Sequence, residues 1–269
     1  MKRQRLDQLL VDQGFFPSRE RAKAAVMEGL VFAGGQRLDK PGAQVEPETA
    51  LEVRGNALPW VSRGGLKLEK ALSVFPCDVA GKVCLDCGAS TGGFTDVLLH
   101  AGAERVYAVD VGYGQLAWKL RSDPRVINLE RTNARYLTSE QVPEPVDLAV
   151  MDLAFISIRL VLPAAEALLR EGGEAVCLIK PQFEAGREKV GKKGVVRDKQ
   201  AHLEVLSSLA DFFPTAGFTL LGLDFSPIRG PEGNIEFLAY LKKGVHPAPG
   251  TAPTAVIDAA HAAFENQYS

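Results

Sequence analysis

The sequence predicts an α/β fold, in which a small α+β domain precedes a large domain built on a mostly parallel sheet of seven strands. From Lys67 onward, apolar strand-like runs alternate with helical patterns, and this alternation is typical of a parallel sheet with helices on both faces. A glycine-rich segment directly follows the first of these runs, as it does in Rossmann-like domains. Residues 1–55 instead show two short helices and a hairpin.

Seven apolar runs define the expected strands of the large domain. They lie at 82–87, 105–111, 125–129, 146–153, 174–180, 218–225 and 235–241. Helical patterns lie between them, for example at 91–100, 159–169 and 199–213. No helical pattern separates the last two runs, so we expect them to pair antiparallel.

The chain divides by composition into four parts. Residues 1–55 form the small domain, in which Leu6, Leu9 and Leu10 share a helical face, Ser18 can cap a second helix, and Gly34-Gly35 can turn a hairpin. Residues 56–66 read as a linker punctuated by Pro and Gly. Residues 67–243 form the large domain, and 244–269 are a C-terminal extension that begins Pro/Ala-rich and ends helical.

Composition excludes several classes of protein. The net charge of −2 excludes a chain that is basic overall, although it allows local basic patches. The longest stretch without Asp, Glu, Lys or Arg is 244–257, which contains three prolines and is shorter than the roughly 20 apolar residues of a membrane span. The N-terminal sequence lacks the apolar core of a signal peptide, so no membrane association is expected.

The four cysteines are expected to be buried thiols. Cys84 and Cys87 form a CxxC within a strand, where positions three apart face opposite sides, and no second pair has zinc spacing. We therefore predict no metal site. Reduced cysteines of this kind indicate a cytoplasmic protein.

The first strand leads into a loop suited to S-adenosylmethionine. Glycines spaced G-x-x-x-G-G let the backbone approach a ligand at a helix N-terminus, whereas a nicotinamide site prefers G-x-G-x-x-G facing a pyrophosphate. The carboxylate before the loop suits a ligand with a cationic amino acid end rather than a diphosphate. The predicted cofactor residues here are Asp86, Gly88, Ser90, Thr91, Gly92, Gly93 and Phe94.

The next two strands contribute further candidate cofactor residues. Asp110 follows the second strand, 22 residues after Gly88, where a ribose-binding acid belongs. Asn133 and Ala134 follow the third strand, where they could bind an adenine edge. An ordinary loop position is the alternative for this pair.

Four charged residues are predicted to converge at one end of the sheet. Asp152 ends the fourth strand, Lys180 ends the fifth, Glu236 begins the seventh, and Lys67 lies near the start of the domain. A ribose 2′-hydroxyl suits such a tetrad, because it is a poor nucleophile until its proton is removed. A lysine can be the base only when neutral, so its pKa should be lowered by desolvation or a neighbouring ammonium.

Two other methylation chemistries are not favoured. Asp152 is not followed by the Pro-Pro-aromatic motif of exocyclic base methylation. The fourth strand also lacks a Pro-Cys pair for attack on a pyrimidine, and Cys177 lies mid-strand.

The sequence resembles the TlyA family, in which an S4 RNA-binding domain precedes an FtsJ-like methyltransferase. The resemblance covers roughly residues 1–243. The matching motifs are S-R-G-G-x-K-L, D-x-G-x-S-T-G-G-F-T-D, V-D-V-G-Y-G-Q-L, E-R-T-N-A-R, M-D-L-A-F-I-S, L-I-K-P-Q-F-E, G-V-V-R-D and S-P-I-x-G-x-x-G-N-I-E-F.

This resemblance implies S-adenosylmethionine-dependent 2′-O-methylation of cytidine in ribosomal RNA. Longer members act on both subunits and shorter ones on the large subunit, so the terminal extensions here lead us to expect both 16S and 23S rRNA. The resemblance assigns the catalytic tetrad to Lys67, Asp152, Lys180 and Glu236, with Lys180 as base. The family's R-x-W-V linker segment is Leu58-Pro59-Trp60-Val61 here, without the arginine.

Two surfaces are candidates for RNA contact. In the S4-like domain these are the positions where such modules hold phosphates: Arg3, Arg5, Ser18, Arg19 and Lys23. The second is the glycine-rich basic segment 186–197. A non-enzymatic ribosome-assembly factor and a haemolysin, a name that some family members carry, are the alternative functions.

Overall fold

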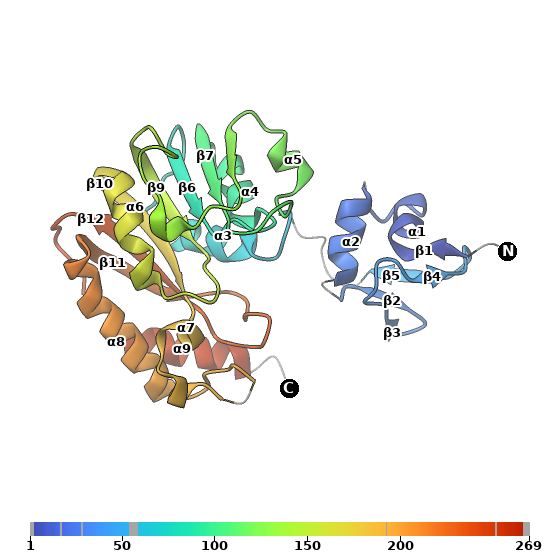
Figure 1. The fold of residues 1–269 in the computed structure, drawn as a ribbon. Helices are drawn as coiled ribbons and strands as arrows, with labels where there is room; N and C mark the ends of the chain where they lie inside the picture. The colour runs from blue at the N-terminus through green and yellow to red at the C-terminus, as the bar shows by residue number, and fades with distance from the viewer. Residues whose placement is uncertain are drawn as a thin grey trace. The chain divides into compact units, whose positions relative to one another are not determined.

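The computed structural model describes residues 3–16, 18–27, 29–53, 59–191, 193–250 and 252–265 (Figure 1). Within the chain, Met1–Arg63 and Gly64–Ser269 form two compact units. Leu58 of the expected linker segment lies outside the described residues. Gly65 and Leu66, also expected in the linker, instead begin helix α3 (Gly65–Val74), because Leu66 continues the apolar pattern of that helix.

In its described residues, the small unit has two helices and five short strands. Helix α1 (Leu6–Asp12) and helix α2 (Arg19–Met27) bury their apolar faces in one core with the strands, as the leucine spacing predicted. The hairpin turns at Gly34-Gly35, where both φ angles are positive. The strands are β1 (Gln4–Arg5), β2 (Val31–Ala33), β3 (Gln36–Arg37), β4 (Gln44–Val45) and β5 (Leu51–Val53).

The large unit is built on a seven-stranded sheet, as predicted. Its strands are β6 (Val83–Cys87), β7 (Arg105–Val109), β8 (Val126–Leu129), β9 (Val146–Met151), β10 (Leu169–Ile179), β11 (Phe218–Phe225) and β12 (Phe237–Lys243). They lie in the order β11-β12-β10-β9-β6-β7-β8. All paired neighbours are parallel except those of β12, which runs antiparallel to both β10 and β11.

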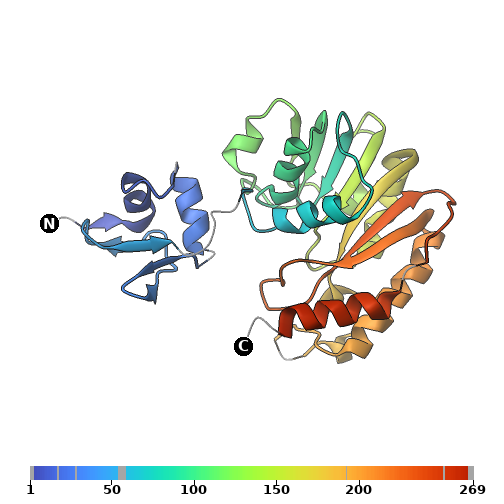
Figure 2. The same ribbon diagram turned by 180° about the vertical axis from the view of Figure 1, so that it is seen from behind.

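Helices cover both faces of this sheet (Figures 1 and 2). Helices α3 and α4 (Gly93–His100) lie on one face, and α6 (Leu162–Leu168) and α8 (Lys199–Thr215) lie on the other. Short helices occupy the connections: α5 (Trp118–Arg121), α7 (Pro181–Glu184), η1 (Ala134–Tyr136), η2 (Ile158–Leu160) and η3 (Arg187–Lys189). The predicted helix at 159–169 is shorter than expected, because η2 ends at Leu160 before α6 starts and β10 already begins at Leu169.

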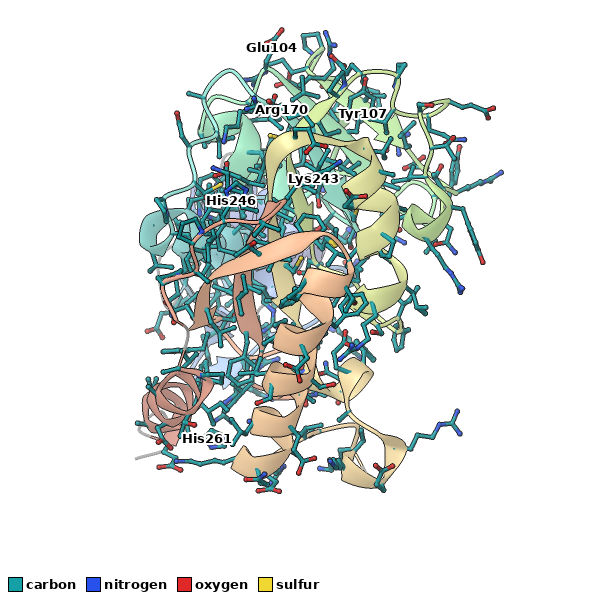
Figure 3. All side chains as sticks on the ribbon, turned by 90° about the vertical axis from the view of Figure 1, so that its left-hand side faces the viewer. Glu104, Tyr107, Arg170, Lys243, His246 and His261 are labelled. Atoms are coloured by element: carbon teal, nitrogen blue, oxygen red, sulfur yellow. The ribbon has the colours of Figure 1, made fainter. Side chains whose placement is uncertain are left out.

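The strand registers bring one set of strand ends together. Cys87 of β6 is opposite Val109 and Met151, and Ile179 of β10 is opposite Phe237 of β12. The carboxyl ends of the parallel strands and the start of β12 therefore share one edge, here called the carboxyl edge. Figure 3 shows Glu104, Arg170 and Lys243 at the opposite end of the sheet.

Residues 253–265, expected as part of an extension, form helix α9 (Pro253–Glu265) and pack into the large unit. Ile257, Ala260 and Phe264 are buried in the same core as the sheet. Helix α9 lies beside α8, where Nε2 of His261 is 3.1 Å from Nδ1 of His202 (Figure 3). Burial lowers the pKa of His202 to about 4, so this imidazole is neutral near pH 7.

The described part of the chain contains neither a membrane-spanning helix nor a cluster of metal ligands. None of the helices there is long and apolar enough to cross a bilayer. No group of three or more His, Cys, Asp or Glu residues there could hold a metal ion. The four cysteines are buried free thiols. Burial raises the pKa of the Cys77 and Cys177 thiols to about 12, which makes them unreactive.

Candidate active site

A tight glycine loop joins β6 to α4 at the carboxyl edge. Gly88 has φ +87° and Gly92 has φ +96°, a left-handed conformation that side chains disfavour. A Cβ at Gly88 would lie 2.6 Å from the backbone oxygen of Asp152, and one at Gly92 would lie 2.2 Å from the Leu120 side chain. The two glycines are therefore required for the loop to pack against the neighbouring strand end and helix.

Substituting Gly88 should both destabilise the fold and displace Asp152. We expect Gly88→Ala to lower the free energy of unfolding by ~2–5 kcal/mol, because left-handed strain adds to a clash with backbone. Gly81→Ala is the matched control, since Gly81 has φ +68° but an added Cβ meets nothing within 4 Å. Chemical denaturation of both variants tests this expectation, and equal losses would contradict it.

Asp86, the carboxylate expected to face the ligand's cationic end, is fully buried on β6. The Thr95 hydroxyl donates to its Oδ2 at 2.7 Å, whereas its Oδ1 is buried without a hydrogen-bond partner. Burial raises the pKa of Asp86 to about 7. A buried acceptor with an unused lone pair costs free energy unless a donor arrives, so Asp86 suits an ammonium group drawn toward this loop.

Asp110 ties the glycine loop to the segment after β7. Its carboxylate accepts hydrogen bonds from the backbone N–H groups of Ser90 at 2.8 Å and Gly112 at 2.7 Å. The side chain of Gln115, which was not among the predicted site residues, lies over Gly112, and its Oε1 accepts a hydrogen bond from the Ser90 hydroxyl at 3.3 Å. The motif that ends G-Y-G-Q-L, which contains Gln115, is the sequence signal that could have identified it.

The other predicted cofactor residues divide into backbone and core positions. Ser90 has φ +50°, Thr91 lies in the same turn, and Gly93 begins α4. Phe94 is 3% exposed and packs inward, so its side chain does not face the loop's outer surface. Asn133 uses its side-chain oxygen to cap η1 through the Arg135 N–H at 3.0 Å, and Ala134 is buried. Phe94 therefore belongs to the core, and the Asn133 side-chain oxygen already accepts one hydrogen bond from the protein.

The four predicted catalytic residues meet in one cluster, here called the tetrad. Nζ of Lys67, from α3, lies 2.7 Å from Glu236 Oε2 and 3.4 Å from Asp152 Oδ2. Nζ of Lys180 lies 2.5 Å from Asp152 Oδ1. Glu236 is fully buried, and the side chains of Lys67, Lys180 and Asp152 are 7, 12 and 19% exposed.

Charge pairing decides how the tetrad ionises. Burial acts to lower the pKa of Lys67, but Asp152 and Glu236 more than offset it, so the pKa of Lys67 is raised. Lys67 is therefore held in its charged form by the two carboxylates that lie against it, whereas the lowered pKa was expected of the base, Lys180. Burial raises the pKa of Glu236, whereas the two ammonium groups outweigh burial at Asp152 and lower its pKa.

Phe155, a second residue that sequence reasoning missed, lies three residues after Asp152 and is 91% exposed. Its φ of +62° is unusual for a bulky side chain. Its ring lies beside that of Phe183, with centroids 5.3 Å apart and the two planes tilted by 51°. An exposed aromatic held in a strained backbone beside the tetrad is a candidate surface for stacking.

The predicted RNA-binding residues of the small unit gather around Asp7 and Glu46. Arg5 and Arg19 both pair with the buried Asp7, at 2.7 and 3.2 Å, and Arg3 pairs with Glu46 at 2.8 Å. All three arginines remain about half exposed or more. Lys23 is exposed, and Ser18 Oγ accepts a hydrogen bond from the Arg21 N–H at 3.4 Å. The arginines keep N–H groups available for an anion.

Family models match both units. The FtsJ-like methyltransferase model matches residues 60–243, and the S4 domain model matches residues 4–51. A solved structure from Streptococcus thermophilus, provisionally named a hemolysin, is 48% identical with a TM-score of 0.80, covering 100% of this chain and 99% of that chain.

Curated relatives also align over most of the chain. The provisionally named rRNA methyltransferase YqxC of Bacillus subtilis is 53% identical, covering 89% of this chain and 86% of that protein. The 16S/23S rRNA (cytidine-2′-O)-methyltransferase TlyA of Mycobacterium tuberculosis is 47% identical, covering 90% of each. With its S4 domain, its methyltransferase sheet and these relatives, the chain belongs to the TlyA family of FtsJ-like methyltransferases.

Proposed function

We propose that this protein transfers the methyl group of S-adenosylmethionine to the ribose 2′-oxygen of cytidine in ribosomal RNA, in both 16S and 23S rRNA. The observation that carries the proposal is the tetrad: two lysines and two carboxylates, far apart in sequence, meet within ion-pair distance next to the glycine loop. That the named M. tuberculosis relative acts on cytidine of both rRNAs supports the choice of substrate.

The residues of the loop fit the proposed cofactor. The glycines let the loop turn and pack where a Cβ could not fit, the buried Oδ1 of Asp86 has no hydrogen-bond donor within the protein, and Asp110 lies against the loop through the Ser90 N–H. When bound, S-adenosylmethionine supplies a methyl group on a sulfonium, which is reactive toward an oxygen nucleophile. Asp86 and the α4 N-terminus would hold its amino acid end, and Asp110 would hold its ribose.

The tetrad supplies a proton acceptor and an orienting frame. Lys180, in its neutral form, would take the proton from the 2′-hydroxyl and so make that oxygen a nucleophile toward the methyl group. Asp152 holds Lys180 at 2.5 Å and aims its Nζ. Lys67 is kept charged by Asp152 and Glu236. It pairs with Oδ2 of Asp152, whereas Lys180 pairs with Oδ1, so the two lysines hold the Asp152 carboxylate between them. Much of the acceleration then comes from positioning.

The small unit would supply RNA affinity. Arg3, Arg5, Ser18, Arg19 and Lys23 offer donors to phosphates, and such contacts position an enzyme without choosing the nucleotide. The glycine-rich basic segment 186–197, with Lys192 outside the described residues, is a second candidate contact. Because ribosomal subunits are the proposed substrate, we place the protein in the cytoplasm.

Phe155 is expected to stack on a base of the bound RNA. We expect Phe155→Ala to raise KM for the RNA about 5- to 150-fold, which corresponds to the ~1–3 kcal/mol that base stacking on an aromatic contributes. Phe155→Tyr should keep most of the affinity. Val245→Ala, which removes a fully exposed side chain elsewhere, is the control. An unchanged KM in Phe155→Ala would contradict the stacking role.

Methyl transfer to purified subunits tests the proposal. Radiolabelled S-adenosylmethionine is incubated with 30S and 50S subunits that lack the modification. We expect label in both, and label in one subunit alone would reject dual specificity. Absence of label in both, with S-adenosylmethionine binding intact, would favour a non-enzymatic ribosome-assembly factor.

A further inference from the structure

Glu184 lies at the end of α7, one helical turn beyond Lys180, and its carboxylate faces the loop that carries Asp152. The Ser157 hydroxyl donates to Oε2 at 2.6 Å, and the Ile158 backbone N–H donates to Oε1 at 2.8 Å. Both carboxylate oxygens are therefore used, and both donors come from the start of η2.

Burial of this carboxylate removes it from water and so costs free energy. Its side chain is 3% exposed, and Nε of Arg159 lies 4.0 Å from its Oε2. Arg159 is itself held elsewhere, donating to the Ser208 hydroxyl at 2.9 Å and lying over the Phe212 ring. Burial raises the pKa of Glu184. A buried carboxylate without a close cation is retained only where its hydrogen bonds matter.

The two hydrogen bonds that Glu184 accepts form a second connection between the segment of Lys180 and the segment of Asp152. Lys180 and Glu184 bracket α7, whereas Asp152 and Ser157 bracket the loop after β9. The Lys180–Asp152 ion pair joins one end of each segment, and Glu184 joins the other ends. Phe155 lies within the doubly connected loop, and its ring contacts Phe183 of α7.

We propose that Glu184 is a positioning residue for methyl transfer: it caps η2 and thereby fixes the loop 152–158, so that Asp152 and Phe155 keep their places relative to Lys180. The inference rests on the proposed function for its kinetic consequence, but the connection itself is a property of the fold. Small displacements of reacting groups are costly, because a shift of about 1 Å can reduce a rate on the order of 100-fold.

Two readouts test the proposal in the full-length protein. Hydrogen–deuterium exchange across residues 152–161 requires no substrate, and Glu184→Ala should speed exchange at the Ile158 amide at least about tenfold. In methyl-transfer assays the same variant should lose about 10- to 100-fold in kcat, with the dissociation constant for S-adenosylmethionine unchanged.

Conservative and control variants separate positioning from general destabilisation. Glu184→Gln keeps an acceptor for the Ile158 N–H, and the Ser157 hydroxyl can rotate to accept from its amide, so we expect kcat within about threefold of the parent. Glu174→Gln is the matched control: Glu174 is a largely buried carboxylate on β10, paired with Lys82 and bonded to Tyr240 at the opposite end of the sheet. It should leave both exchange at 152–161 and kcat unchanged.

Unchanged exchange at Ile158 in Glu184→Ala, or faster exchange with unchanged kcat, would overturn the positioning role. An equal loss of kcat in Glu174→Gln would also overturn it, because the effect would then be one of stability. If the parent protein transfers no methyl group to rRNA, the proposed function fails, and the exchange result still decides whether Glu184 holds the loop.

Discussion

Replacing Lys180 by Met should reduce methyl transfer about 100- to 10,000-fold while the protein remains folded. The loss corresponds to removal of a general base, whose contribution lies in that range. The fold should persist because Asp152 keeps Lys67 as a partner at 3.4 Å. Binding of S-adenosylmethionine should be unaffected, because the ion pair that Lys180 forms is with Asp152 and not with a side chain of the glycine loop. Single-turnover kinetics and calorimetric binding measure the two effects separately.

Lys82→Met is the matched control for this prediction. Lys82 is a mostly buried lysine, 18% exposed, paired with Glu174 at 2.6 Å at the opposite end of the sheet. Its removal should change stability without changing the rate of transfer. Comparable rate losses in the two variants would show that Lys180 acts through the fold rather than at the reacting atoms.

The second large effect concerns stability, and it falls on Lys67. We expect Lys67→Met to lower the free energy of unfolding by ~3–5 kcal/mol, because the fully buried Glu236 would lose its partner at 2.7 Å. Burial already raises the pKa of Glu236. At low pH the buried carboxyl of the variant is protonated and uncharged, so its burial costs little. As pH rises through its raised folded-state pKa, the carboxyl must ionise without a partner, and the loss of stability should grow.

A double-mutant cycle tests the origin of this effect. Glu236→Gln removes the buried charge, so Lys67→Met combined with Glu236→Gln should be more stable than Lys67→Met alone near pH 8. Urea denaturation at pH 5 and pH 8 supplies the four free energies at each pH. A loss below about 1 kcal/mol that does not vary with pH would contradict the pairing described for the tetrad.

Local sequence patterns predicted much of the large unit, because strand ends and glycine loops have local signatures. The positions of Asp152, Lys180 and Glu236 at strand ends were sufficient to expect the tetrad, since parallel strands share a carboxyl edge. The insertion of β12 between β10 and β11 was not predicted, because periodicity does not encode which strands pair.

The ionisation of the site and its supporting contacts required coordinates. The raised pKa of Lys67 could not be predicted from sequence, because it depends on the distances from its Nζ to two carboxylates. Glu184 stands in a motif that the sequence showed, but its donors come from a loop 26 residues away or more. Burial of Phe94 depends on which side of α4 faces the sheet, and helical spacing alone did not distinguish the core from the ligand side.

The chemical identity of the methylated nucleoside tests the central claim most directly. Ribosomal RNA from 30S and 50S subunits treated with the protein and S-adenosylmethionine is digested to nucleosides and resolved by mass spectrometry, with the Lys180→Met variant in parallel. The account predicts 2′-O-methylcytidine from the parent protein and none above background from the variant. A methyl group on a base, or equal 2′-O-methylcytidine from both proteins, would contradict it.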